Sequence, residues 1–145
     1  MKDEIEACNC GNYGCLEQYT SATGIVRMAK RKLAKTSEDT NLRKFDALTA
    51  KDVFDEAKAG DAIAVELVDE VCEILGGALS NIACVVDPDV IVIGGGVSKA
   101  GNILIENIQK HFEETAFHAC RETKFALAGL GNDAGMYGCV QMLLD

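Results

Sequence analysis

The sequence has few residues of several types, and each shortage limits the structures or the partners that the protein can have. Tryptophan is absent and Pro88 is the only proline among 145 residues, so long helices can run without interruption. Basic residues are few, with 14 against 23 acidic ones, which gives a formal net charge of −9. Because no basic stripe or run occurs, we expect no nucleic-acid partner.

Long hydrophobic runs and a secretory signal are also lacking. The longest apolar stretches fall far short of a membrane span, so no membrane partner is expected. Seven cysteines are present, and an odd number without a signal peptide argues against a secreted disulfide scaffold. We therefore predict a reducing, cytoplasmic location. Apolar residues still make up 48% of the sequence, enough for the core of one domain.

Apolar periodicity predicts mostly helices over residues 16–88. One helix is expected over 16–33, a loop over 36–41, and a second helix from Thr49 to Gly60. Residues 61–88 form the clearest helical pattern, which is apolar on two sides and therefore buried on two sides.

Interior glycines cost about 0.5–1 kcal/mol against alanine, so we expect Gly76-Gly77, in the middle of this long helix, to pack closely against another backbone. Cys72, Cys84 and Cys139 lie among apolar residues and are expected in the core. His111 is interpreted as a surface residue near a helix end.

The remaining residues, 89–145, are expected to form strand, helix, strand and helix. The β-branched run 89–93 predicts a buried parallel strand, and 124–128 a second strand. Ser98 is expected to cap the first of these helices, and Asn132 and Asp133 to cap a last helix over 134–144.

The most specific feature is a loop with three cysteines, Cys8, Cys10 and Cys15. Three thiolates so close together can meet at one tetrahedral metal ion, and sulfur ligands favour zinc. Gly11 and Gly14 allow the chain to double back between the ligands. Three ordinary free cysteines in a mobile loop are the alternative. A fourth ligand is not evident, because both histidines, His111 and His118, lie about a hundred residues away.

The run from Cys8 to Glu17 resembles the Cys-x-Cys-Gly-x-x-Gly-Cys-x-Glu signature of the ROK family of sugar kinases, with every fixed position matched. The resemblance implies a structural zinc held by the three cysteines and by an upstream histidine in a Glu-x-Gly-His segment, which this sequence does not contain. It also implies that the Glu17 carboxylate accepts hydrogen bonds from sugar hydroxyls. From spacing alone, a first-turn acid stabilised by the helix dipole is the favoured explanation of Glu17, and only the complete signature favours the sugar contact.

Residues 87–98 resemble a second glycine-rich segment of the same family, in which the turn borders the nucleotide. The resemblance thus implies nucleotide contacts by Gly94, Gly95 and Gly96, whose backbone amides can approach a phosphate or ribose. Without the family, a purely structural tight turn is just as good an explanation. Residues 129–139 resemble the final motif of the family, for which we expect a structural role.

The resemblance covers almost the whole chain and about the second half of a typical family member. It implies an α/β fold, part of an actin-like, ribonuclease H-like ATPase lobe, which is helix-rich with about two strands. We expect a single incomplete lobe, with a zinc loop (1–17), a helical insertion (18–60) and an α/β core (61–145). Such a lobe is expected to expose apolar surface, and to self-associate or to need the missing N-terminal lobe.

The implied function is a part in ATP-dependent hexose phosphorylation with Mg²⁺, most like the family's bacterial glucokinases, with glucose as the expected hexose. Kinases for fructose or N-acetylated hexosamines stay open. The family's Asp-x-Gly-x-Thr phosphate segment and its catalytic aspartate are absent, so this chain by itself is not expected to phosphorylate sugar. Two alternatives remain, a fragment of a sugar-sensing ROK repressor and an inactive zinc-binding fragment.

Overall fold

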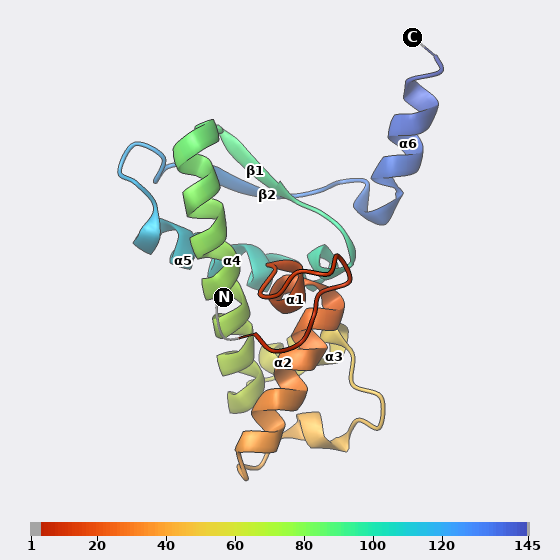
Figure 1. Cartoon of the computed structure of the whole chain (residues 1–145), viewed down its shortest axis with the longest axis vertical. Coiled ribbons are helices and arrows are strands. Elements are labelled where there is room, and N and C mark those ends of the chain that lie inside the picture. Colours follow the sequence, from red (N-terminus) through yellow and green to blue (C-terminus); the bar gives the residue numbers. More distant parts are fainter. Residues whose placement is uncertain (1–3, 145) are drawn as a thin grey trace.

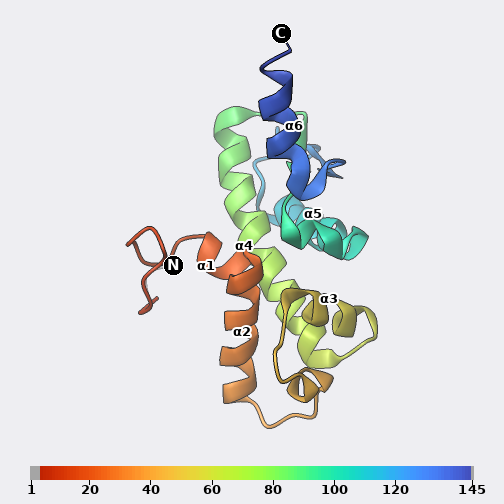
Figure 2. The same ribbon diagram turned by 90° about the vertical axis from the view of Figure 1, so that its right-hand side faces the viewer.

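A computed structural model describes residues 4–144 and arranges them around one long helix, α4 (Ala62–Val86) (Figure 1). The remaining helices and strands, in chain order, are α1 (Glu17–Thr20), α2 (Ala22–Lys35), α3 (Ala50–Lys58), β1 (Val90–Ile93), α5 (Asn102–Thr115), β2 (Lys124–Leu127) and α6 (Ala134–Gln141). Three 3-10 turns join them: η1 (Asn41–Lys44), η2 (Gly96–Ala100) and η3 (Gly131–Asp133). In the second view, α2 and α3 lie beside one half of α4 and α5 beside the other (Figure 2).

The first helical region contains two helices, so the single helix expected over residues 16–33 is wrong. Ser21 leaves the helical conformation, with φ −75° and ψ 165°, and its hydroxyl accepts a hydrogen bond of 3.0 Å from Gly24 N–H. Serine favours this capping position because its side chain competes for backbone donors. The bend is tight, since a Cβ on Gly24 would lie 2.7 Å from the Gln18 carbonyl carbon. Glu17 therefore sits on a short turn of its own, held close to α2.

The helices α3 and α4 agree well with the prediction. Thr49 and Asp52 form a reciprocal capping box at the start of α3. The helix α4 ends at Asp87, which has a left-handed φ of 48° directly before Pro88. Most of the apolar residues of α4 between Ile63 and Cys72 are buried, with Val65 exposed, but its C-terminal end exposes the side chains of Ile82, Val85 and Val86.

The two glycines in the middle of α4 differ in their surroundings. A Cβ on Gly76 would lie 2.9 Å from Ile108 O and from Phe112 N, so this glycine lets the backbones of α4 and α5 approach closely. A Cβ on Gly77 would meet nothing within 4 Å. The expectation of close backbone packing is confirmed for Gly76 and wrong for Gly77.

Four further expectations concern single side chains. Cys72 is buried as expected, whereas Cys84 and Cys139 are exposed because the C-terminal end of α4 and all of α6 lack a covering layer. His111 is buried instead of lying at the surface, because its ring faces Asp69 across the contact between α5 and α4.

The two strands form a parallel sheet, as predicted, with Val90 paired to Lys124 and Ile93 to Leu127. The expected burial of the first strand is wrong, because no residue of β1 is buried. The inner face packs on the helices, and the rings of Phe125 and Phe112 meet edge to face at 5.1 Å. The predicted cap at Ser98 is wrong. Gly101, with φ 78°, separates η2 from α5, and the Ser98 hydroxyl instead donates to Gly95 O at 2.7 Å.

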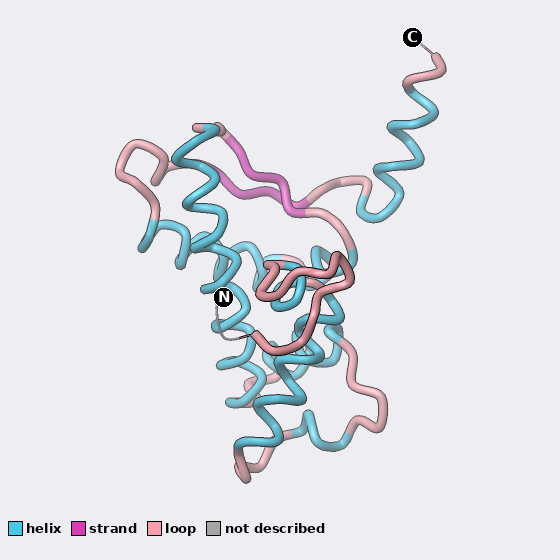
Figure 3. The backbone as a smooth tube through the Cα atoms, in the orientation of Figure 1, coloured by secondary structure: helices cyan, strands magenta, loops and turns pink. Residues whose placement is uncertain are grey.

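The C-terminal helix stands away from the body of the molecule (Figures 1 and 3). It ends at Gln141, three residues earlier than expected, and none of its described residues is buried. Asp133 precedes it without a capping hydrogen bond from its side chain. The outer face of the sheet is exposed too, at Val90, Val92 and Leu127. Among residues 4–144, no helix combines the length and apolar character needed to cross a membrane.

Because so much apolar surface is exposed, the 145-residue chain should associate with itself and bind a hydrophobic dye. The double variant Met136→Glu/Val140→Glu should shift it towards monomer, as seen by light scattering coupled to size-exclusion chromatography. Lys30→Glu lowers the net charge by the same amount at an exposed position on α2 and is the matched control. A compact, monodisperse wild-type monomer without accessible apolar surface would contradict this expectation.

Candidate functional site

The cysteine loop is a compact turn closed by its own backbone. Cys8 N–H donates to Asn12 O at 2.7 Å, and Gly11 N–H donates to Cys8 O at 2.8 Å. Gly11 and Gly14 have φ values of 86° and 71°, in the region that favours glycine. The predicted doubling back of the chain at these glycines is confirmed.

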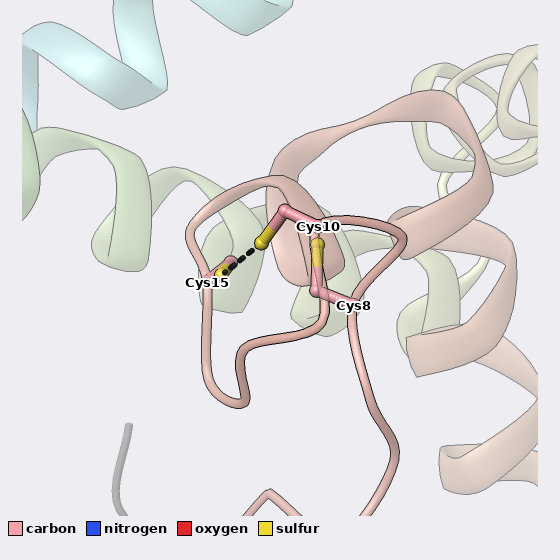
Figure 4. Close-up of side chains that lie close together, drawn as sticks. All are labelled: Cys8, Cys10 and Cys15. Atoms are coloured by element: carbon pink, nitrogen blue, oxygen red, sulfur yellow. Dashed lines mark hydrogen bonds between the residues drawn. The ribbon is translucent and has the colours of Figure 1, made fainter.

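The loop brings the three thiols together. The Sγ atoms of Cys8, Cys10 and Cys15 all lie within 4.8 Å of one another, and those of Cys10 and Cys15 are 3.5 Å apart (Figure 4). A tetrahedral zinc with Zn–S bonds of about 2.3 Å sets its sulfur ligands roughly 3.8 Å apart. The donor set therefore fits zinc with only small side-chain movements.

The thiols influence each other's protonation. A hydrogen bond from the Asn12 backbone, followed by one from the Cys15 thiol, lowers the pKa of Cys10. The hydrogen bond to Cys10, followed by burial, raises the pKa of Cys15 to about 11. The opposite directions arise because the two thiols, 3.5 Å apart, share one hydrogen bond. A metal needs the thiolate forms, so its binding would release protons.

Neither histidine joins the loop. The Nε2 atom of His111 lies 2.8 Å from Asp69 Oδ1, and its Nδ1 atom lies 3.3 Å from Glu114 Oε2. Among residues 4–144, the group of close metal-ligating side chains consists of the three cysteines alone. The upstream histidine implied by the signature stays a prediction.

Glu17 begins α1 directly after the loop and is exposed. Its Oε2 atom accepts a hydrogen bond of 3.3 Å from the Cys8 thiol, so the carboxylate lies directly beside the cysteine loop. The same side chain lines two cavities. One, of about 270 Å³, also contacts Cys8 and Arg27, and the other, of about 390 Å³, contacts Gly94, Gly95 and Gly96.

The glycine turn therefore lies across a cavity from Glu17, although almost eighty positions separate them in the sequence. Gly95 has a φ of 81°. On the other side of Gly96, a smaller cavity of about 150 Å³ is lined by Phe54 and Val97. The structure thus joins two predicted site segments through one hollow and adds an apolar hollow beside the turn.

A buried ion pair behind the cysteine loop was not anticipated. The Glu4 side chain is 1% exposed and accepts two hydrogen bonds from Arg31, of 2.8 and 2.7 Å, and one of 2.9 Å from the Tyr19 hydroxyl. Arg27, one turn earlier on α2, contacts both Glu4 and Glu6. The available signal was that Glu4 and Glu6, two positions apart, and Arg27 and Arg31, four positions apart on a helix, can each present two like charges on one side. Such charged pairs are common on exposed surfaces.

The ion pair makes stability depend on pH. Hydrogen bonds from Arg31 hold the pKa of Glu4 far below its usual range. A lowered folded-state pKa stabilises the fold above the unfolded value of about 4.3, and this contribution is lost as the pH falls further. Urea midpoints between about pH 5 and pH 3 should therefore fall less steeply in Glu4→Gln than in wild type. Equal slopes would show that Glu4 does not titrate against Arg31, and Glu106→Gln is the control at an exposed position.

Fold and site together define a helix-rich α/β unit of the actin-like ATPase type, the class that the sequence predicted. A profile of the ROK family matches residues 1–145. The chain belongs to the ROK family.

Three relatives illustrate the range of the family. A glucokinase from Halalkalibacterium halodurans is 47% identical over 135 residues, which cover 90% of this chain and 41% of that protein. The crystal structure of a ROK family glucokinase from Streptomyces griseus in complex with glucose and AMPPNP superimposes with a TM-score of 0.84 at 30% identity, covering 98% of this chain and 48% of that one. A xylose repressor from Caldicellulosiruptor bescii is 25% identical over 97% of this chain and 36% of its own length. The chain thus spans less than half the length of these relatives.

Proposed function

We propose that this chain forms the sugar-contacting and nucleotide-contacting part of an ATP-dependent hexose kinase, with glucose as the hexose. The observation that carries the proposal is the cavity of about 390 Å³ shared by Glu17 and the Gly94–Gly96 turn. A kinase must hold a hydroxyl nucleophile and a nucleotide phosphate next to each other, and this hollow joins the residues proposed for the two tasks. The relatives named glucokinase support the choice of sugar.

Each part of the site has a chemical role in this proposal. The Glu17 carboxylate accepts hydrogen bonds from neighbouring sugar hydroxyls, because an ionised carboxylate is an acceptor only. The glycine turn offers backbone amides to the nucleotide without obstructing side chains, and the half-buried Val97 offers an apolar contact beside the turn. ATP would arrive with Mg²⁺. The phosphate loop and the catalytic base of the family lie outside this sequence.

We further propose a structural zinc at Cys8, Cys10 and Cys15, with a histidine from a preceding segment as the fourth ligand. The ion would fix the turn that precedes Glu17. In this proposal residues 1–17 are the zinc loop, 18–60 a helical insertion and 61–145 the α/β core of one lobe. The partner is the N-terminal lobe or a second copy, and the cytoplasm is the compartment, where reducing conditions keep the thiols free.

The sugar role is tested by titrating glucose into the zinc-loaded chain and following ligand resonances by saturation-transfer NMR. Glu17→Gln keeps the size of the side chain but removes its charge, and we expect glucose affinity to fall by about 10-fold or more. Glu106→Gln, at an exposed position on α5, should bind as wild type does. An unchanged affinity in Glu17→Gln would remove Glu17 from the sugar site.

A sugar-sensing repressor is the second candidate, because the xylose repressor matches nearly the whole chain. Such a protein needs sugar binding but no phosphoryl transfer. Binding of the ATP analogue AMPPNP separates the two functions, since a kinase part should retain nucleotide affinity that Gly95→Val weakens. Glucose binding without any nucleotide binding would favour the repressor, and binding of neither ligand would favour an inactive zinc-binding fragment.

A further inference from the structure

Gln18 lies where the two ends of the cysteine loop meet. Its side chain is almost fully buried, with 3% of the residue exposed, although it follows the exposed Glu17 directly. A buried glutamine amide is costly unless both its oxygen and its nitrogen find partners. The amide of Gln18 finds both, one on each side of the loop.

The two hydrogen bonds tie the entry of the loop to its exit. The Gln18 Oε1 atom accepts from Cys15 N–H at 3.1 Å, and Nε2 donates to Glu6 O at 2.9 Å. Glu6 precedes the first cysteine by two positions, and Cys15 is the last of the three. The Gln18 side chain thereby sets the distance between the two loop segments that carry the thiols of Cys8 and Cys15.

Both partners of Gln18 are themselves held in place. The carboxylates of Glu4 and Glu6 pair with Arg31 at 2.7 and 2.9 Å, which fixes the segment that carries the Glu6 carbonyl to α2. Arg27 donates to the Gln18 backbone carbonyl, and Gly24 lets α2 approach that carbonyl closely. The backbone of Gln18 and the segment that carries its partner Glu6 are therefore both fixed to α2.

We infer that Gln18 is a positioning residue that pre-assembles the three thiols and sets the direction of Glu17, before any metal is bound. This deepens the proposed function and rests on it for the roles of the thiols and of Glu17. The hydrogen bonds themselves belong to the metal-free chain. Outer partners of metal ligands typically contribute about 10- to 100-fold to metal affinity, because they orient the ligands beforehand.

The test compares Gln18→Met, which removes both hydrogen bonds at nearly constant size, with Gln109→Met, a half-buried glutamine on α5 whose side chain donates to Glu113 one turn further along the same helix. Cobalt(II) is titrated under anaerobic conditions and its thiolate charge-transfer band gives the dissociation constant. Exchange of the Cys15 amide hydrogen is measured separately on the metal-free protein. We expect Gln18→Met to weaken cobalt binding by about 10- to 100-fold and to accelerate Cys15 amide exchange, with Gln109→Met unchanged in both.

The outcomes separate this inference from the proposed function. Cobalt affinity within about twofold of wild type, with an equally protected Cys15 amide, would overturn the role of Gln18 but leave the zinc loop standing. If wild type itself binds no cobalt, the zinc proposal fails, and amide exchange in the metal-free chain still decides whether Gln18 orders the loop.

A second variant covers the case in which Gln18→Met does not fold, as judged by circular dichroism. Gln18→Glu keeps an acceptor for Cys15 N–H but cannot donate to Glu6 O. We expect a protected Cys15 amide together with a cobalt affinity lowered by about 10-fold. Wild-type affinity in folded Gln18→Glu would show that the link to Glu6 positions nothing.

Discussion

Cys10→Ser is expected to abolish stoichiometric zinc binding. Structural zinc sites with four ligands bind with about 10–16 kcal/mol, so one thiolate contributes roughly 2.5–4 kcal/mol, or about 100- to 1,000-fold in affinity. Cys10 is exposed, so its replacement removes one of the three sulfur ligands without opening the core. Wild type should retain about one zinc per chain after dialysis, measured by mass spectrometry of the metal.

Cys139→Ser is the matched control for this experiment. Cys139 is an exposed free thiol on α6, and in the fold α6 stands away from the cysteine loop (Figure 1). Its replacement should leave the zinc content unchanged. Equal zinc retention by the Cys10→Ser and wild-type chains would contradict a three-thiolate site, because two thiolates would then suffice.

The two glycines of α4 should respond to alanine with opposite signs. Gly76→Ala places a methyl group 2.9 Å from two backbone atoms of α5, which cannot move independently of their helix. Such overpacking typically lowers the free energy of unfolding by about 1–3 kcal/mol. Gly77→Ala meets open space and should raise it by about 0.5–1 kcal/mol, because alanine restricts the unfolded chain.

Urea unfolding at low protein concentration measures both changes against one wild-type curve. The two substitutions are chemically identical and adjacent, so differences in helix propensity cancel between them. A gain of stability in Gly76→Ala would show that α4 and α5 are not packed backbone to backbone at this point.

Much of the fold followed from local pattern. The parallel strands and the long helix were predictable, because a short β-branched run is typical of a buried strand and apolar residues spaced three to four positions apart are typical of a helix. The errors arose where one side chain or glycine redirects the backbone. Ser21 splits a continuous apolar pattern into two helices, and Gly101 moves the start of α5 beyond Ser98. Neither event changes the apolar periodicity, so periodicity could not show it.

Part of the candidate site was predictable from the sequence and part was not. The convergence of Cys8, Cys10 and Cys15 was predictable from their spacing, since eight residues with two glycines can close only a small loop. Gln18 and Glu4 could not be found, because their partners are backbone atoms or lie fifteen or more positions away. Burial of a polar side chain depends on three-dimensional contacts that no local pattern encodes.

The close contact at Gly76 also limits how the molecule can move. Since α4 and α5 meet backbone to backbone, and Asp69 and His111 join them again, these helices should rotate as one rigid body. Flexing between Glu17 and the glycine turn would then be confined to Ser21 on one side and to Gly95 and Gly101 on the other, where the backbone leaves helical geometry. A hinge at these joints would change the width of the shared hollow without disturbing the core.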